Sequence, residues 1–285
     1  MKQMMAEVGI IGGSGIYDPS IFEDTRELNI DTPFGRPSDN VIIGRLGERE
    51  VAFISRHGKG HLYSPTKVNY RANIFALKKL GVKSIIGVCA VGSLKEEIKP
   101  LDIVIPDQIY DRTKYRKNTF FDDIVVHVGF AEPFCKRLSD KLYEATKKMG
   151  YRVRLGGTYL CIEGPQFSTK AESNVYRKLG FDIVGMTAIP EAKLAREAEI
   201  CYATLATVTD YDVWKEEEVS VSEVVENVMK NAQAVKDILK EFIPLLAEGK
   251  CGCRDALKDA IVTDLSRIDS EKMKKLEILI GRYIK

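Results

Sequence analysis

The stretch IIGVCA at residues 85–90 is apolar at nearly every position, and it decides the fold. A strand with one face in solvent alternates apolar and polar residues, whereas a strand covered on both faces is apolar throughout. Residues 85–90 therefore predict a central strand between two layers of helices. Similar short strands are predicted at 8–11, 103–105, 159–162, 181–184 and 204–208, with an antiparallel pair at 41–43 and 51–55 around Gly47.

Helical patterns alternate with these strands. Apolar residues recur at helical spacing in residues 66–80, 132–149 and 220–242. Gly81 and Gly150 follow the first two patterns, as glycine often does just past a helix end. The alternation predicts an α/β fold, a single-domain three-layer α/β/α architecture with a central mixed, largely parallel sheet. Ligands of such sheets bind beyond the carboxyl ends of the strands.

The composition excludes several classes of protein. The chain has 285 residues, of which 45% are hydrophobic, and a net charge of +2 from 43 basic and 41 acidic side chains. It shows no basic stripe of the kind that nucleic-acid binding needs, no apolar segment long enough to span a membrane and no signal peptide at its beginning. We expect a cytoplasmic protein that binds neither nucleic acid nor membrane.

Two motifs with phosphate-binding chemistry follow predicted strands. GGSG at 12–15 allows consecutive backbone amides to face one anion, although Asp18 breaks the dinucleotide-binding fingerprint, which needs glycine or alanine there. Arg56 and His57 follow the strand at 51–55, and the planar guanidinium group fits phosphate. The alternative for each motif is a turn or a surface loop without a ligand.

Two further motifs suit a flat heterocycle and proton transfer. Phe167 and Ser168, in EGPQFS at 163–168, offer an aromatic ring and a hydroxyl, although Phe167 could equally be a core residue. Asp210 and Asp212 follow the strand at 204–208. Burying a carboxylate costs several kcal/mol unless it is paired or protonated, so the pair indicates acid–base chemistry; strand-end turn residues are the alternative.

We expect no metal and no cofactor. His57 and His61 have the spacing of ligands on one helix face, but Gly58 and Gly60 argue against a helix. The chain has six cysteines without the CxxC pairs of a zinc site. The four outside the predicted strand interiors are read either as reduced thiols with no joint role or as disulfides of the kind found in hyperthermophiles; they are Cys135, Cys201, Cys251 and Cys253.

Taken together, nine ordered stretches resemble the 5′-methylthioadenosine phosphorylases of the purine nucleoside phosphorylase family. They cover residues 8 to about 245 and comprise GIIGGSGIYDP (9–19), TPFGRPSD (32–39), RHGKGH (56–61), KVNYRANIFALK (67–78), AVGSL (90–94), AEPFC (131–135), IEGPQFST (162–169), GMTAIPEAKLA (185–195) and TDYDVW (209–214). The CxC motif at 251–253 resembles the archaeal, thermophilic branch, in which intramolecular disulfides are typical. By that resemblance the pairs are Cys135–Cys201 and Cys251–Cys253.

The resemblance implies phosphorolysis of 5′-methylthioadenosine to adenine and 5-methylthioribose 1-phosphate, with inorganic phosphate as co-substrate. It assigns phosphate contacts to Ser14, Arg56, His57, Cys89, Ala90 and Thr187. It assigns ribose contacts to Met186 and His127, base contacts to Phe167, Ser168, Asp210 and Asp212, and the methylthio pocket to Val221, Val224 and Val225. His127 would come from a neighbouring subunit, which implies a homotrimer or a dimer of trimers.

The chemistry explains these assignments. Departure of the purine leaves an oxocarbenium-like ribose that phosphate stabilises and attacks, and protonation at N7 neutralises the departing base. We expect Asp210 to supply that proton. Asp210 also favours 6-aminopurines, because relatives selective for 6-oxopurines carry asparagine there, and Val221 favours a methylthio group where nucleoside-preferring relatives have histidine. Cys89 and Gln166 depart from the hydroxyl and the arginine usual in the family.

Three alternatives stay open at this point. They are a broader purine nucleoside phosphorylase acting on adenosine, inosine or guanosine, a non-catalytic nucleotide-binding protein, and a hydrolase that uses water. Residues 1–265 form the predicted phosphorylase domain, and residues 266–285 extend beyond the end typical of the family. Helical spacing in that tail predicts a helical extension packed at a subunit interface; the apolar positions are Met273, Leu276, Ile280 and Tyr283.

Overall fold

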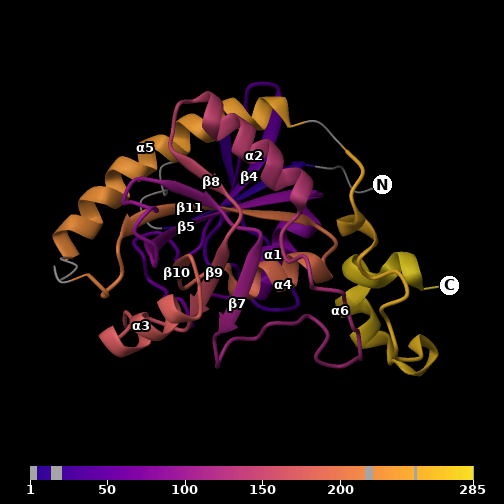
Figure 1. Cartoon of the computed structure of the whole chain (residues 1–285). Helices are drawn as coiled ribbons and strands as arrows, with labels where there is room; N and C mark the ends of the chain where they lie inside the picture. The colour runs from indigo at the N-terminus through magenta and orange to yellow at the C-terminus, as the bar shows by residue number, and fades with distance from the viewer. Residues whose placement is uncertain (1–4, 14–20, 216–220, 247–248, 285) are drawn as a thin grey trace.

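A mixed β-sheet forms the centre of the molecule in the computed structural model, which describes residues 5–13, 21–215, 221–246 and 249–284 (Figure 1). Its strands are β1 (Val8–Gly12), β2 (Glu23–Leu28), β3 (Val41–Leu46), β4 (Arg49–Ser55), β5 (Ser84–Ser93), β6 (Ile103–Ile105), β7 (Gln108–Arg112), β8 (Val153–Leu155), β9 (Thr158–Ile162), β10 (Ile183–Gly185) and β11 (Cys201–Asp210). The hydrogen-bonded order is β2-β3-β4-β1-β5-β10-β9-β7, and β11 joins β5 to β6, which in turn pairs with β8.

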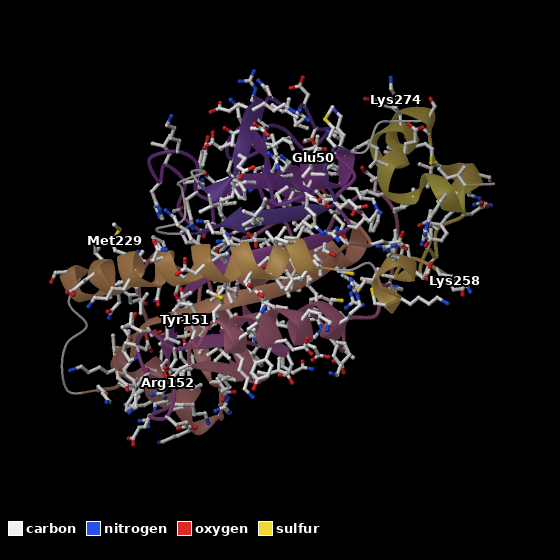
Figure 2. The ribbon with its side chains drawn as sticks, turned by 90° about the horizontal axis from the view of Figure 1, so that it is seen from above. Glu50, Tyr151, Arg152, Met229, Lys258 and Lys274 are labelled. Carbon is white, nitrogen blue, oxygen red and sulfur yellow. The ribbon has the colours of Figure 1, made fainter. Side chains whose placement is uncertain are left out.

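Helices cover both faces of this sheet (Figure 1). They are α1 (Tyr70–Lys79), α2 (Lys136–Lys148), α3 (Lys170–Lys178), α4 (Ala188–Glu197), α5 (Val221–Leu245) and α6 (Ser270–Ile280). Seen from above, α5 runs across the molecule, with Met229 toward one end and the C-terminal segment that carries Lys258 and Lys274 beyond the other (Figure 2). Among the described residues, no helix combines the length and apolarity needed to cross a bilayer.

The apolar stretch that predicts a central strand lies in β5. This strand pairs in parallel with β1 on one side and with β11 on the other, and its last residues pair antiparallel with β10. The strand is longer than residues 85–90, and all but two of its ten residues are buried. The predicted pair around Gly47 is also confirmed, because β3 and β4 are antiparallel neighbours.

Two apolar cores lie on opposite faces of the sheet. Alternation along β4 shows this directly, because Ala52 and Ile54 belong to one core while Val51 and Phe53 belong to the other. The first core takes side chains from α1, α4 and α6, and the second takes them from α2 and α5. The predicted three-layer arrangement is therefore confirmed.

Two helices begin later in the chain than predicted. The helix predicted at 66–80 begins at Tyr70, because the side chain of Asn69 accepts a hydrogen bond from the backbone N–H of Ala72 at 3.2 Å. The helix predicted at 132–149 begins at Lys136, with Cys135 as its N-cap.

The sequence prediction missed several elements, namely β2, β7, β8, α3 and α4. In β2, for example, five of six residues are exposed, so the strand shows no apolar alternation.

The C-terminal tail is helical, as predicted, and packs on its own chain. Leu276, Leu279 and Ile280 of α6 are buried in the first core, and Met273 and Tyr283 pack against it. Arg282 forms an ion pair with Glu199 at 2.8 Å, which joins the tail to the residues just before β11. The apolar face of this helix is therefore covered within one chain rather than left for a partner.

Candidate active site

A cavity of about 290 Å³ opens where the carboxyl ends of β1, β4, β5 and β11 meet. These four strands run parallel to one another, so the residues that follow them share one edge of the sheet. Ten predicted site residues line the cavity: Arg56, His57, Ala90, Phe167, Ser168, Met186, Thr187, Asp210, Asp212 and Val224. Ser14 and the side chain of Val221 lie outside the described residues.

Arg56 is completely buried beside the cavity and is paired with an acidic residue that the sequence prediction missed. Its Nε donates to Oε1 of Glu191 at 2.5 Å, and its Nη2 donates to Oε2 at 3.0 Å. Nη1 donates to the backbone carbonyl of Val88 at 2.7 Å. Both side chains of the pair are 0% exposed. Burial acts to lower the pKa of Arg56, but the charge of Glu191 holds it well above its usual value.

His57 is held in one tautomer. Its Nδ1 lies 2.8 Å from the carbonyl oxygen of Tyr63, and because a carbonyl can only accept, Nδ1 carries the proton. Burial, followed by the charge of Arg56, lowers the pKa of His57 to about 4. The ring is therefore neutral near pH 7, and Nε2 offers a lone pair to a ligand. His61 stacks on this ring with centroids 4.3 Å apart.

The Cys89 side chain is buried and does not line the cavity, and its assignment to the phosphate contacts stays a prediction. Cys89 is buried in the first core, whereas the next three residues of β5, Ala90, Val91 and Gly92, line the cavity. The Cys89 sulfur instead accepts a hydrogen bond from Oγ1 of Thr187 at 3.2 Å. Cys89 thus contacts Thr187, which lines the cavity, without lining the cavity itself.

Arg116, which the sequence prediction also missed, joins two loops that form the cavity wall. Its side chain is 1% exposed, and its Nη1 donates to the carbonyl of Met186 at 2.5 Å and of Ile189 at 2.6 Å. Nη2 donates to the Glu163 carbonyl at 2.6 Å, and Nε pairs with the carboxylate of the same residue at 3.2 Å. Arg116 therefore fixes Met186 relative to the loop that carries Phe167 and Ser168.

A β-bulge at the end of β11 turns two consecutive side chains into the cavity. The register with β5 shifts between Val208 and Asp210, and both Thr209 and Asp210 line the site. Asp210 is half-buried; its Oδ2 lies 2.6 Å from Oγ1 of Thr209, and its Oδ1 accepts from the backbone N–H of Asp212 at 2.7 Å. The same Thr209 hydroxyl lies 3.2 Å from the Val91 carbonyl.

Buried polar atoms without a hydrogen-bond partner gather at the same end of the cavity. Among the described side chains they include Oγ of Ser168, Oγ of Ser173 and Oδ2 of Asp212. Burial raises the pKa of Asp212, which is 5% exposed, while the nearby hydroxyls of Ser173 and Ser168 act to lower it. A buried polar group left unpaired costs about 1–3 kcal/mol. Ser168 and Asp212 both line the cavity, so a polar ligand there can satisfy them.

The apolar wall of the cavity comes from one face of α5, but not from all the valines that were predicted. Val224 and Val228, one turn apart, both line the site. Val225 is 55% exposed and does not line it, because a residue next to Val224 is rotated by about 100° around the helix. Among the described side chains of α5, Val224 and Val228 therefore form the wall, and Val225 does not line it.

His127 lies outside the cavity of its own chain. It is exposed, and its backbone N–H donates to the Ala260 carbonyl at 2.9 Å. Phe167 lines the site but is 61% exposed, so it lies at the rim rather than in the core. The side chains of His127 and Phe167 can therefore contact a second copy of the chain or a ligand.

The predicted disulfide pairs are absent from the structure, in which all six cysteines are free thiols. The sulfur atoms of Cys201 and Cys251, a pair that was not predicted, lie 3.2 Å apart and within hydrogen-bond range. Cys135, Cys201, Cys251 and Cys253 do not line the cavity just described.

Comparison with known proteins identifies relatives that match over nearly the whole chain. Residues 7–244 match the family model described as the phosphorylase superfamily. An S-methyl-5′-thioadenosine phosphorylase of Koribacter versatilis is 51% identical over 98% of this chain and 97% of that protein. The enzyme of the same name from Hyperthermus butylicus is 52% identical over 90% of this chain and 96% of its own length.

Solved structures agree with these sequence matches. A methylthioadenosine phosphorylase from an Antarctic soil metagenomic library superposes with a TM-score of 0.93 at 47% identity, over 97% of this chain and 99% of that one. A methylthioadenosine phosphorylase of Schistosoma mansoni in complex with adenine superposes with a TM-score of 0.85 at 40% identity, over 90% of this chain and 97% of that one.

Proposed function

The chain belongs to the phosphorylase superfamily, and we propose that it cleaves 5′-methylthioadenosine with inorganic phosphate, releasing adenine and 5-methylthioribose 1-phosphate. The relatives at about half identity over nearly the full length all carry that activity in their names. The observation in the structure that carries the proposal is a cavity with cationic and hydroxyl groups at one end and unpaired buried polar atoms at the other.

Phosphate binds at the end formed by Arg56, His57, Ala90 and Thr187. The sequence prediction adds Ser14, which lies outside the described residues. The Thr187 hydroxyl donates to the Cys89 sulfur, which is a weak acceptor, so a phosphate oxygen is the better partner for that proton. Neutral His57 accepts through Nε2, which suits the protonated oxygen of hydrogen phosphate. Glu191 offsets the charge of Arg56, so this end binds phosphate through directed donors rather than through a large net charge.

Adenine binds at the end formed by Phe167, Ser168, Asp210 and Asp212. Its exocyclic amine donates hydrogen bonds and its ring nitrogens accept them, which complements a hydroxyl and two carboxyl groups. Ser168 Oγ and Asp212 Oδ2 are buried without partners and gain the most from such a ligand. Phe167 at the rim offers its ring face for stacking.

Asp210 supplies the proton to N7 in this proposal, and the Thr209 hydroxyl serves both protonation states of that carboxyl group. When Asp210 is ionised, the hydroxyl donates to its Oδ2. When Asp210 is protonated, the hydroxyl can donate to the Val91 carbonyl and accept from the acid. A general acid that changes charge during the reaction needs such a neighbour, and general acids typically contribute about 10²–10⁴-fold in rate.

The reaction then proceeds by exchange at the anomeric carbon. The C1′–N9 bond breaks, its electron pair passes to the purine ring, and the proton of Asp210 goes to N7. A phosphate oxygen forms the new bond to C1′. Met186, which lines the cavity and is fixed by Arg116, supports the ribose between the two ends. No cofactor enters the scheme, because phosphate is the second substrate.

Apolar side chains of α5 select the 5′ substituent. Val224 and Val228 line the cavity, and a methylthio group buries apolar surface against them where a hydroxyl would lose its hydration. This contact favours methylthioadenosine over adenosine by about 1–3 kcal/mol.

We also infer a homo-oligomer, a trimer or a dimer of trimers, in which His127 completes the ribose site of a neighbouring copy. Its exposure and its distance from the cavity of its own chain support this. Mixing His127→Ala and Asp210→Asn chains tests it, because a site shared between subunits regains activity in mixed oligomers. Activity that stays at the level of the two separate variants would contradict it.

The function itself is tested by measuring kcat/KM for methylthioadenosine, adenosine and inosine with and without phosphate. We expect cleavage to require phosphate, to release adenine with a sugar 1-phosphate, and to be fastest with methylthioadenosine. Equal or better use of inosine would indicate a broader nucleoside phosphorylase and a different base pocket. Phosphate-independent release of free methylthioribose would indicate a hydrolase, and binding without turnover a non-catalytic protein.

A further inference from the structure

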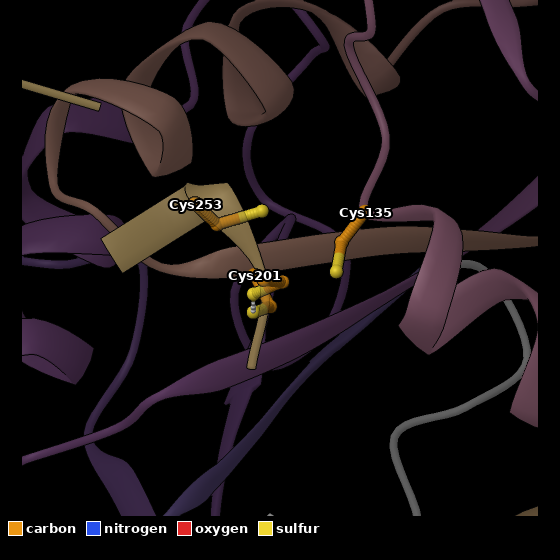
Figure 3. A group of neighbouring side chains, drawn as sticks. Cys135, Cys201 and Cys253 are labelled. Carbon is orange, nitrogen blue, oxygen red and sulfur yellow. Dashed lines mark hydrogen bonds between the residues drawn. The ribbon is translucent and has the colours of Figure 1, made fainter. Parts of the chain in front are cut away.

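Four cysteine side chains meet at one point, although three separate segments of the chain supply them. Cys135 is the N-cap of α2, Cys201 is the first residue of β11, and Cys251 and Cys253 flank Gly252 after α5. All four sulfur atoms lie within 4.8 Å of one another. Figure 3 shows the sulfur atoms of Cys135, Cys201 and Cys253 turned toward the space between them.

We propose that these four cysteines form a structural zinc site with four thiolate ligands. Zinc takes cysteine sulfur at about 2.3 Å in tetrahedral geometry, which places neighbouring sulfur atoms about 3.8 Å apart. The observed Cys201–Cys251 separation of 3.2 Å and the 4.8 Å limit for the whole group lie on either side of that value. Shifts of about 1 Å or less therefore bring the four side chains around an ion.

The donor set identifies the metal class. Four sulfur ligands without a carboxylate suit zinc rather than magnesium or calcium, which prefer oxygen. Four protein ligands also close the coordination sphere, as in structural rather than catalytic zinc sites. The cluster does not line the substrate cavity, so this role is separate from the proposed reaction.

The surroundings suit the charge of such a site. Binding converts four thiols and one Zn²⁺ into a tetrathiolate complex of charge −2, with the release of four protons to solvent. Nη2 of Arg137 lies 3.8 Å from the Cys201 sulfur. Cys135 stands at the N-terminus of α2, where the helix dipole favours negative charge. Both features stabilise thiolates over thiols.

An entry path for the ion is also present. A second cavity, of about 640 Å³, is lined by Cys135, Cys251 and Cys253 together with Arg137 and Glu132. Cys251 is half-buried, while the other three cysteines are buried. A metal ion can therefore reach the cluster from one side and then lie in a largely dry site.

The position of the site indicates what the ion does. Cys201 belongs to the sheet and Cys135 to the helix that covers it, whereas Cys251 and Cys253 belong to the connection between α5 and the C-terminal tail. An ion bound by all four fixes that connection to the sheet and so stabilises the docking of α6.

Metal content of the intact protein tests the proposal. We expect about one zinc ion per chain after purification in reducing buffer without added metal, as measured by inductively coupled plasma mass spectrometry. Cys251→Ser and Cys253→Ser each lose the zinc, whereas Cys161→Ala, at a buried cysteine outside the cluster, keeps it. A wild-type protein that contains no zinc and takes none up overturns the proposal.

Cobalt binding tests the proposal in the wild-type protein, so the result does not depend on whether a cysteine variant folds. The wild-type protein is stripped with a chelator in the presence of a reductant and then titrated with Co²⁺. We expect sulfur-to-cobalt charge-transfer bands that saturate near one equivalent and disappear when Zn²⁺ is added. Absence of these bands in folded protein overturns the proposal.

Thiol counting distinguishes the site from disulfides. A denatured sample treated with chelator and no reductant exposes all six thiols if the cluster holds zinc. Fewer thiols, with a protein mass lowered by two hydrogens for each missing pair, show that the cluster is oxidised and overturn the proposal.

Discussion

Glu191 holds Arg56 through two hydrogen bonds, at 2.5 and 3.0 Å, in a position where neither side chain is exposed to solvent. Removing one partner of such a buried pair costs about 3–5 kcal/mol, because the remaining charge is left without compensation. A phosphate dianion bound at Arg56 would supply the same compensation. The strength of phosphate binding and the stability of the free protein are therefore linked through Glu191.

Glu191→Gln tests that link. We expect the variant to unfold at a lower temperature than the wild type, with the deficit in free energy about 3–5 kcal/mol. Because phosphate can then neutralise Arg56, saturating phosphate should raise the unfolding temperature of the variant more than that of the wild type. Thermal unfolding with and without phosphate measures both effects, and equal phosphate shifts in the two proteins would contradict the link.

Gly13→Ala should weaken phosphate binding. A Cβ atom at this position would lie 2.7 Å from the Val88 carbonyl oxygen and 2.8 Å from Nη1 of Arg56, so the strand or the guanidinium must move. We expect KM for phosphate to rise at least tenfold while KM for methylthioadenosine changes less. Gly281→Ala, where the nearest atom is 3.6 Å from the added Cβ, is the matched control and should behave as the wild type.

Asp210→Asn should lower kcat by about 10²–10⁴-fold, since an amide cannot protonate N7. A substrate methylated at N7 leaves without needing that proton, so its cleavage should be nearly unchanged in the variant. Steady-state kinetics with both substrates separate the two roles of the residue. If the methylated substrate slows as much as methylthioadenosine does, Asp210 positions the base rather than protonating it.

Val228→Ser should reduce the preference for methylthioadenosine over adenosine. The serine hydroxyl replaces part of the apolar wall and can hydrogen-bond a 5′-hydroxyl, so the ratio of the two kcat/KM values should fall by about tenfold or more. Val225→Ser changes a neighbouring valine that is 55% exposed and does not line the cavity. That control should leave the ratio unchanged; a matching fall there would assign the effect to the helix as a whole.

Glu197→Gln should change how stability depends on pH. Burial raises the pKa of Glu197 to about 7 from a usual value of 4.5, against hydrogen bonds from Phe120 and Thr119 that lower it. Between these values the folded chain keeps a proton that the unfolded chain has lost, so the free energy of unfolding falls as pH rises, by about 3 kcal/mol in total. Glutamine has no such proton to lose.

The expected result is that Glu197→Gln gains stability relative to the wild type between pH 5 and pH 8, measured by denaturant unfolding. His57, whose pKa is lowered to about 4, changes stability in the opposite direction, rising with pH up to about 6.5. Comparing the variant with the wild type at each pH cancels that contribution. Parallel stability curves would show that Glu197 titrates normally.

Strands that are buried on both faces were predictable from sequence, because burial leaves an unbroken apolar run. The stretch at 85–90 predicted β5. The residues that follow the strands parallel to it, among them Arg56, His57 and Asp212, predicted part of the cavity lining. Exposed strands such as β2 carry no such signal. The local sequence pattern thus predicts a strand well where both of its faces are buried, and poorly where the strand is exposed.

Features that depend on two distant segments were not predictable. Glu191 lies 135 residues from Arg56, and nothing in either motif shows that they pair. Val225 was assigned to the cavity by resemblance to the family, but in this chain it is 55% exposed, and the part of α5 that faces the site presents Val224 and Val228. The four cysteines were considered as two disulfide pairs, but their meeting in one cluster was not predicted, since they are not arranged as CxxC pairs.

The strand β11 begins at Cys201 and ends at Asp210, so its ten residues place the sulfur cluster and the carboxyl group proposed to protonate the base about 30 Å apart on one rigid element. Changes in one end need not disturb the other. Related enzymes can therefore hold the beginning of this strand by a metal ion, by a disulfide or by apolar packing alone. Such changes adapt the stability of the protein to heat or to redox conditions without altering which nucleoside it cleaves.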